Sequence, residues 1–203
     1  MPLQRHYEKC LMKYGPNHKG MDWPNHSDLK KRFNAHLKIL ENHNDVTLLD
    51  LGCGAGLLVD YLQEFYSQKN LLYHGIDISE LMIDEARKKH PHTKFEVLDI
   101  LNYDDNIPSS DFVIANGLFT EKLTLSFKEM NDFMEAMLIK MFQLCTIGIS
   151  FNLMSSHVDW ERSDLFHVST DHVVQFLTKN VSRKLNIFMD YGLYEYTIHV
   201  YKS

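Results

Sequence analysis

Three features are scarce in this sequence: cysteine, basic charge and long hydrophobic runs. Its three cysteines, Cys10, Cys53 and Cys145, are too few and too widely spaced for a disulfide framework or a zinc site. We therefore expect reduced thiols, as in a cytoplasmic protein, and no bound metal. The apolar runs are far too short to span a membrane, and the N-terminal segment lacks the apolar core of a signal peptide. A soluble cytoplasmic protein without a membrane partner is predicted.

The balance of charge is acidic. The chain has 21 lysines and arginines against 27 aspartates and glutamates, which gives a formal net charge of −6. A surface that follows a nucleic-acid backbone normally carries a basic excess, so we expect no nucleic-acid partner. The length of 203 residues suits one α/β domain with a short extension.

Strand and helix patterns alternate along most of the chain. Residues 1–45 are polar and helix-prone, which predicts a helical N-terminal cap within the same domain as residues 46–203. Apolar runs then predict strands at 46–51, 71–76, 94–98, 111–116, 147–153, 183–189 and 194–201. Helices are predicted at 29–41, 57–68, 79–90, 127–145 and 170–179.

Repeated strand–helix units form parallel sheets with helices on both faces. The last two predicted strands are joined by a link around 190–192, which is too short for a parallel crossover. We therefore predict a doubly wound α/β fold. Its sheet is expected to be seven-stranded and mostly parallel, with an antiparallel terminal strand that could also join a homodimer.

A glycine-rich turn follows the first predicted strand. Glycines in the sequence Gly52-Cys53-Gly54-Ala55-Gly56 let the backbone turn sharply and approach a ligand. The next strand ends at Asp77, where an acid can accept hydrogen bonds from both hydroxyls of a ribose. A dinucleotide site has the different spacing G-x-G-x-x-G. Asp50 would also repel a pyrophosphate but suit the ammonium of a methionine moiety, so a nicotinamide oxidoreductase is disfavoured.

The loop Asp50–Gly56, with the sequence DLGCGAG, resembles the first motif of class I, Rossmann-like methyltransferases that use S-adenosyl-L-methionine. Segments 77–79 and 99–100 resemble the second and third motifs of that family, and the resemblance covers about residues 46–201. It implies an enzyme that binds S-adenosyl-L-methionine and transfers a methyl group to a small-molecule acceptor.

The resemblance also implies roles for individual residues around the cofactor. The glycines would line its methionine part, Asp77 would hold the ribose, and Ile78 would pack on the adenine. Asp99 and Ile100 would fix the adenine edge. Asn116 would lie near the transferred methyl, unless it is only a turn residue. The cofactor-binding residues expected on these grounds, together with one cap arginine, are Arg32, Asp50, Gly52, Gly54, Asp77, Ile78, Asp99, Ile100 and Asn116.

Arg32 lies on the predicted cap helix. An arginine there can pair with the cofactor carboxylate in a bidentate manner. The alternative is a solvated charge beside Lys30 and Lys31. Some of the aromatic residues in the cap and in the loops after strands are expected to wall the substrate pocket; they are Tyr7, Tyr14, Trp23, Phe119 and Trp160.

A narrower resemblance involves patches such as 116–119, 149–152 and 190–195. They are similar to a group of bacterial methyltransferases from surface-polysaccharide biosynthesis. That group often has Ser-Gly-Ile-Phe where this chain has Asn116-Gly117-Leu118-Phe119, which leaves the role of Asn116 open. The resemblance implies O-methylation of a sugar or of a phosphoramidate-type precursor.

Candidate bases follow the fifth predicted strand. Ligands of open parallel sheets sit beyond the carboxyl ends of the strands, so the segment from Met154 to His172 is expected to cover the acceptor. His157, Asp159 and His172 are the candidate catalytic residues within it, although each histidine can equally be a surface or capping residue. Two other functions stay open: a non-catalytic cofactor-binding protein of the same fold, and a protein or RNA methyltransferase.

Overall fold

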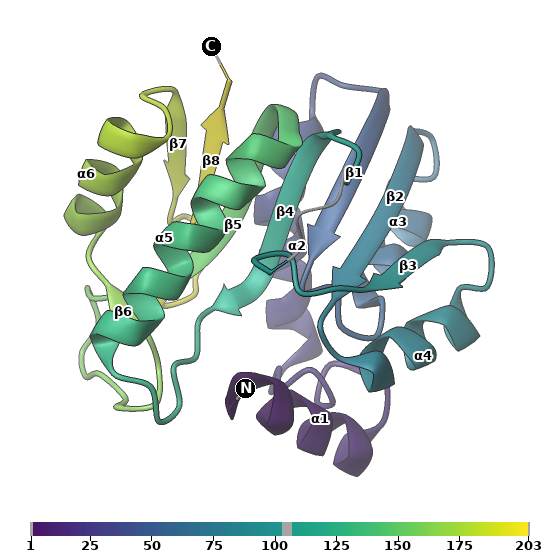
Figure 1. Cartoon of the computed structure of the whole chain (residues 1–203), viewed down its shortest axis with the longest axis horizontal. Coiled ribbons are helices and arrows are strands. Elements are labelled where there is room, and N and C mark those ends of the chain that lie inside the picture. The colour runs from purple at the N-terminus through teal and green to yellow at the C-terminus, as the bar shows by residue number, and fades with distance from the viewer. Residues whose placement is uncertain (1, 103–106, 203) are drawn as a thin grey trace.

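The strands of the chain join into one sheet with helices packed on it (Figure 1). The computed structural model describes residues 2–102 and 107–202. Its strands are β1 (Asp45–Leu51), β2 (Asn70–Asp77), β3 (Lys94–Val97), β4 (Ser110–Phe119), β5 (Cys145–Ser155), β6 (His167–Val168), β7 (Leu185–Phe188) and β8 (Glu195–Tyr201). Its helices are α1 (Pro2–Tyr14), α2 (His26–Leu37), the 3-10 helix η1 (Lys38–Leu40), α3 (Leu57–Phe65), α4 (Glu80–Lys89), α5 (Phe127–Leu144) and α6 (Thr170–Asn180).

The strand order is β3-β2-β1-β4-β5-β8-β7, and the two-residue β6 pairs with β5 beside this path. The pairs from β3 to β5 are parallel. β8 runs antiparallel to both β5 and β7. The predicted fold, a mostly parallel sheet with an antiparallel strand at the end of the chain, is confirmed.

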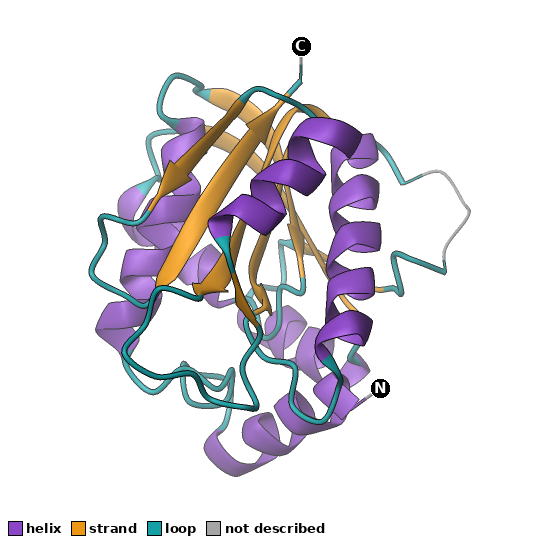
Figure 2. Cartoon of the chain, turned by 90° about the vertical axis from the view of Figure 1, so that its left-hand side faces the viewer, coloured by secondary structure: helices purple, strands orange, loops and turns teal. Residues whose placement is uncertain are grey.

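Helices cover both faces of the sheet (Figure 2). On one face, α5 and α6 pack on the strands, and the buried methionines 130, 134, 137 and 141 supply much of this core. The spacing of three or four residues places these methionines on one side of α5. A capping box between Ser126 and Glu129 fixes where α5 begins. On the other face, α2 and α3 bury Leu29, Phe33 and Leu58 against β1 and β4.

The expected cap divides into two parts. α2 packs on a face of the sheet, whereas α1 and the turn after it lie across the carboxyl ends of the parallel strands (Figure 1). Leu11 of α1 packs against Ala55 and Met82, and so joins α1 to the glycine turn and to α4. Within the described residues, no helix combines the length and apolar character that crossing a membrane requires.

Candidate functional site

A cavity of about 180 Å³ lies at the carboxyl ends of β1, β2 and β4. The glycine turn after β1 forms its floor, and α1 with the following turn forms its roof. Ligands of doubly wound folds bind at this end of the sheet, where neighbouring loops diverge. The expected cofactor residues Asp50, Gly52, Gly54, Asp77, Ile78, Asp99, Ile100 and Asn116 all line the cavity. Arg32 does not line it.

The glycine turn depends on backbone conformations that favour glycine. Gly52 and Gly54 have φ of 71° and 54°, in the left-handed region. The turn is tied to the next strand, because the Gly52 and Cys53 amides both donate to the Ile76 carbonyl, at 2.8 and 3.1 Å. This arrangement brings the backbone against the cavity without a side chain between them.

Asp77 stands at the end of β2 and faces the cavity. Its Oδ2 accepts from the Gly54 amide at 2.9 Å, and its Oδ1 accepts from the Ser79 amide at 2.8 Å. Each carboxylate oxygen therefore keeps a lone pair for a further donor. Burial raises the pKa of this carboxyl, while the two amides oppose the rise. Two fixed oxygens with spare lone pairs fit a pair of adjacent hydroxyls.

Asp50, near the end of β1, is almost fully buried at 3% exposure. The Tyr73 hydroxyl donates to its Oδ2 at 2.6 Å. Burial raises the pKa of Asp50 to about 7, although the Tyr73 hydrogen bond acts in the opposite direction. A cationic group in the cavity would favour the carboxylate form and relieve this cost.

The opposite end of the cavity is mostly apolar. Ile78, Leu98 and Ile100 line it together with Asp99. The Asp99 carboxylate is oriented by the Leu101 amide at 3.2 Å and by Asn102 Nδ2 at 2.7 Å. An apolar slot with a carboxylate at its edge suits a flat heterocycle that carries an amino group.

The turn after residue 116 in β4 closes a third side. Gly117 has a φ of 79°, and a Cβ there would come within 2.4 Å of the Trp23 ring. The Gly117 amide donates to Asn152 Oδ1 at 2.7 Å. Asn116 lines the cavity, and its buried Oδ1 accepts no hydrogen bond of regular geometry from the described residues, while its side chain also lies near the His36 imidazole.

Residues 21–23 pack against two turns, the one from Gly52 to Gly56 and the one at Gly117. The Ala55 amide lies 3.4 Å from the Met21 sulfur, and this sulfur occupies the space beside Gly54. Trp23 packs on Gly117 in the same manner. Of the aromatics singled out in the sequence, Tyr7 and Trp23 line the cavity, whereas Tyr14, Phe119 and Trp160 do not. The close approach of Met21 gave no signal in the sequence.

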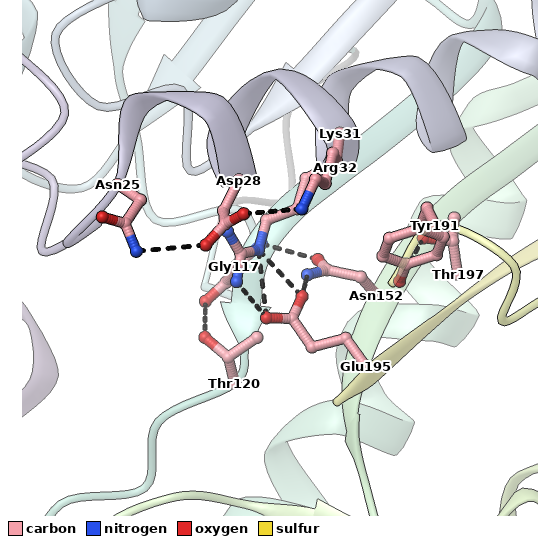
Figure 3. Close-up of polar contacts among 10 residues, drawn as sticks. All are labelled: Asn25, Asp28, Lys31, Arg32, Gly117, Thr120, Asn152, Tyr191, Glu195 and Thr197. Carbon is pink, nitrogen blue, oxygen red and sulfur yellow. Dashed lines mark hydrogen bonds and ion pairs between the residues drawn. The ribbon is translucent and has the colours of Figure 1, made fainter. Parts of the chain in front are cut away.

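Arg32 has a partner other than the expected cofactor carboxylate. Its Nε donates to Glu195 Oε1 and Oε2 at 3.0 and 2.9 Å (Figure 3). The side chains are 9% and 3% exposed. Trp23 covers the guanidinium, with its ring centre 4.1 Å from Cζ. The sequence-based role of Arg32 is therefore corrected, because a carboxylate of the protein itself holds this guanidinium.

Hydrogen bonds link this ion pair to the wall of the cavity. Asn152 Nδ2 donates to Glu195 Oε2 at 2.8 Å, and Asn152 Oδ1 accepts from Gly117 (Figure 3). Thr120 Oγ1 in turn donates to the Gly117 carbonyl at 2.9 Å. A buried polar chain thus connects α2, β8 and β5 to the turn in β4. Arg32 supports the site from behind this turn.

The three candidate bases do not reach the cavity, which is a second correction. His157 and Asp159 are exposed, and Asp159 accepts from the Tyr194 hydroxyl at 3.0 Å. His172 Nε2 lies 2.7 Å from Asn131 Oδ1 on α5. The reason is that β5 continues to Ser155, which carries the following loop past the cofactor end of the sheet.

Comparisons with known proteins agree with this geometry. Residues 48–138 match a family described as a methyltransferase domain. The protein Rv1506c of Mycobacterium tuberculosis, which is named as a methyltransferase, is 28% identical over 170 residues. That match covers 82% of this chain and 99% of the relative.

Solved structures share the fold at low sequence identity. A TehB-like S-adenosylmethionine-dependent methyltransferase from Corynebacterium glutamicum is 15% identical, with a TM-score of 0.62 over 98% of this chain and 99% of the other. Magnesium protoporphyrin IX methyltransferase from Synechocystis PCC 6803, solved with S-adenosylhomocysteine, is 17% identical, with a TM-score of 0.61 over 87% and 81%.

Proposed function

We propose that this chain, as a class I, Rossmann-like methyltransferase that depends on S-adenosyl-L-methionine, methylates an oxygen atom of a small, uncharged acceptor. The proposal adds two statements to the family assignment: the part that each cavity residue plays, and the class of acceptor. Both are argued from the described residues.

The cavity residues fit the cofactor in kind and in position. We infer that the two oxygens of Asp77 hold the ribose hydroxyls, and that Ile78 and Ile100 hold the adenine between them. Asp50 would face the ammonium group, whose positive charge would favour the carboxylate form of this buried acid. Asn116 would lie near the methionine end.

When bound, the cofactor supplies an electrophilic methyl group on a sulfonium sulfur that is a good leaving group. The chain then has to align the acceptor oxygen with that methyl and exclude water. Trp23, Met21 and Tyr7 of the roof exclude water in this account. Tyr7 lines the same cavity from α1, so we assign its side chain the task of packing against the acceptor.

The enclosure of the cavity is the observation that carries the small-acceptor proposal. Residues 21–23 contact both glycine turns, and Leu3, Gln4 and Tyr7 of α1 line the same cavity, which narrows the access to it. A folded protein or an RNA duplex would require an open cleft at this position. A small molecule or a single extended group fits beneath α1.

The charge of the lining supports an uncharged acceptor. Its described residues include Asp50, Asp77 and Asp99 but no lysine, arginine or histidine. An anionic acceptor would lack a counter-charge from the protein. Of the two acceptors that the narrower resemblance implies, we therefore favour a sugar hydroxyl over a phosphoramidate-type oxygen.

A competition between acceptors tests this function. The chain is supplied with labelled S-adenosyl-L-methionine and separate pools of neutral sugars, nucleotide sugars, carboxylic acids, unfolded protein and RNA, and release of S-adenosylhomocysteine is measured. Turnover in the neutral pool supports the proposal, and Tyr7→Ala, which removes the ring from the cavity wall, should then raise KM more than it lowers kcat. Turnover only with acids, protein or RNA contradicts the acceptor class. Cofactor binding without turnover in any pool would favour a non-catalytic role.

A further inference from the structure

A group of metal-binding side chains lies on the roof of the cavity, outside the cofactor site. His6 and Cys10 come from α1, one turn apart, and Asp22 comes from the turn that follows it. One ligand atom from each of the three lies within 4.8 Å of the others. Glu121, from the loop after β4, reaches the same place.

One imidazole nitrogen is the centre of this group. His6 Nε2 lies 2.7 Å from Asp22 Oδ2, 3.8 Å from the Cys10 sulfur and 3.4 Å from Glu121 Oε2. A single N–H proton can bond to only one of these three atoms. Glu121 Oε2 is buried and accepts no hydrogen bond from the described residues. Several atoms that can serve as metal ligands therefore converge on one imidazole nitrogen.

We propose that His6, Cys10, Asp22 and Glu121 form a binding site for a divalent transition metal ion, with Zn²⁺ as the best fit. Imidazole nitrogen, thiolate sulfur and carboxylate oxygen are the ligands that Zn²⁺ takes, in a tetrahedral arrangement. With ordinary bond lengths, neighbouring ligand atoms around Zn²⁺ are about 3.3–3.8 Å apart. Two of the three distances from His6 fall in this range, and the hydrogen bond to Asp22 would open to admit the ion.

The electrostatics of the group favour a cation. The carboxylates of Asp22 and Glu121 and the sulfur of Cys10 all face the same imidazole nitrogen. The side chains of His6 and Asp22 are 32% and 35% exposed, so an ion can enter from solvent. Binding would release protons and neutralise the crowded carboxylates.

The position of Asp22 gives the site a consequence for the cofactor. Asp22 lies between Met21, which covers Gly54, and Trp23, which covers Gly117. Its backbone has a φ of 58°, which is uncommon for a residue other than glycine. An ion that joins Asp22 and α1 to Glu121 would fasten the roof to the loop after β4. This consequence rests on the proposed cofactor site, whereas binding of the ion does not.

The experiment uses the full chain, first stripped with a chelator and kept reduced. Titration with Co²⁺ should give visible bands of tetrahedral cobalt and a near-ultraviolet thiolate band, at one ion per chain, and Zn²⁺ should displace both. Cys10→Ser should remove the thiolate band. His6→Gln should weaken Zn²⁺ binding by at least about tenfold, whereas His92→Gln, an exposed histidine outside the group, should not.

Two results would overturn the proposal: absence of stoichiometric Co²⁺ or Zn²⁺ binding by the native chain, or binding that His6→Gln and Cys10→Ser leave unchanged. Both are read without the cofactor, so they are independent of the proposed methyl transfer. A separate titration with S-adenosylhomocysteine then tests whether the ion joins the roof to the loop after β4. Zn²⁺ should tighten its binding to the native chain and to His92→Gln, but not to His6→Gln, and an equal effect in all three would contradict the coupling.

Discussion

Replacing Arg32 by methionine should destabilise the fold, with little direct effect on the cofactor. The change keeps most of the side-chain stem but removes the charge that Glu195 faces, and Glu195 is only 3% exposed. Removing one partner of a buried ion pair leaves the other charge uncompensated, which costs about 3–5 kcal/mol. A domain of this size is stable by only about 5–15 kcal/mol, so the expected loss is a large fraction of the total.

Equilibrium unfolding in urea, followed by circular dichroism, measures this loss. Lys31→Met is the matched control on the same helix, because Lys31 makes a half-exposed pair with Asp28 at 2.9 Å (Figure 3). A pair of that kind contributes only about 0–1 kcal/mol. The difference between the two variants isolates the buried pair from the general effect of a charge removed from α2.

The opposite pattern would refute the reasoning. If Arg32→Met unfolds at nearly the native urea concentration but binds S-adenosylhomocysteine much more weakly, Arg32 contacts the cofactor after all. The ion pair with Glu195 would then be incidental. Binding is measured well below the unfolding transition, so that loss of folded protein is not counted as loss of affinity.

Two further predictions concern a glycine turn and a buried acid. Gly117→Ala should lower the free energy of unfolding by about 1–3 kcal/mol more than Gly192→Ala does. Both glycines have a positive φ, but only at Gly117 would a Cβ meet Trp23. Equal losses of stability in urea unfolding would contradict this. Burial raises the pKa of Asp50 to about 7, so its carboxylate becomes available to an ammonium group as the pH rises through that value. The affinity for S-adenosylhomocysteine, measured by calorimetry, should therefore increase over this pH range, and Asp50→Asn should remove the increase. A native affinity that does not depend on pH would contradict the pairing of Asp50 with the ammonium group.

The sequence predicted the sheet, and it grouped residues that line one cavity, because both depend on local patterns. Apolar runs and helical periodicity gave most element boundaries to within a few residues, for example Phe127–Leu144 for a helix expected at 127–145. The turn from Gly52 to Gly56 and the acid Asp77 could be placed together because β1 and β2 are adjacent and parallel. Their carboxyl ends must then meet at one edge of the sheet.

The sequence-based predictions differ from the structure where contacts between residues far apart in the sequence determine the position of a side chain. The partner of Arg32 is 163 positions away in the sequence, so nothing near Arg32 indicated that its charge would be buried. The predicted bases failed because β5 is longer than its apolar run suggested and its loop is bound to the loop after β4, where the Lys122 and Leu123 amides donate to the Asp164 carbonyl. The group around His6 likewise combines α1, a turn and a distant loop.

Calorimetric titration of S-adenosylhomocysteine tests the central claim, that the cavity at the carboxyl ends binds this cofactor through Asp77. The native chain should bind, and Asp77→Ala should weaken binding by about 1.5–3 kcal/mol, or roughly 10- to 150-fold, because the ribose hydroxyls lose a charged acceptor. Asp84→Ala removes a half-exposed acid of α4 outside the cavity, and should leave the affinity unchanged. Absence of binding by the native chain, or native affinity in a folded Asp77→Ala variant, would contradict the account.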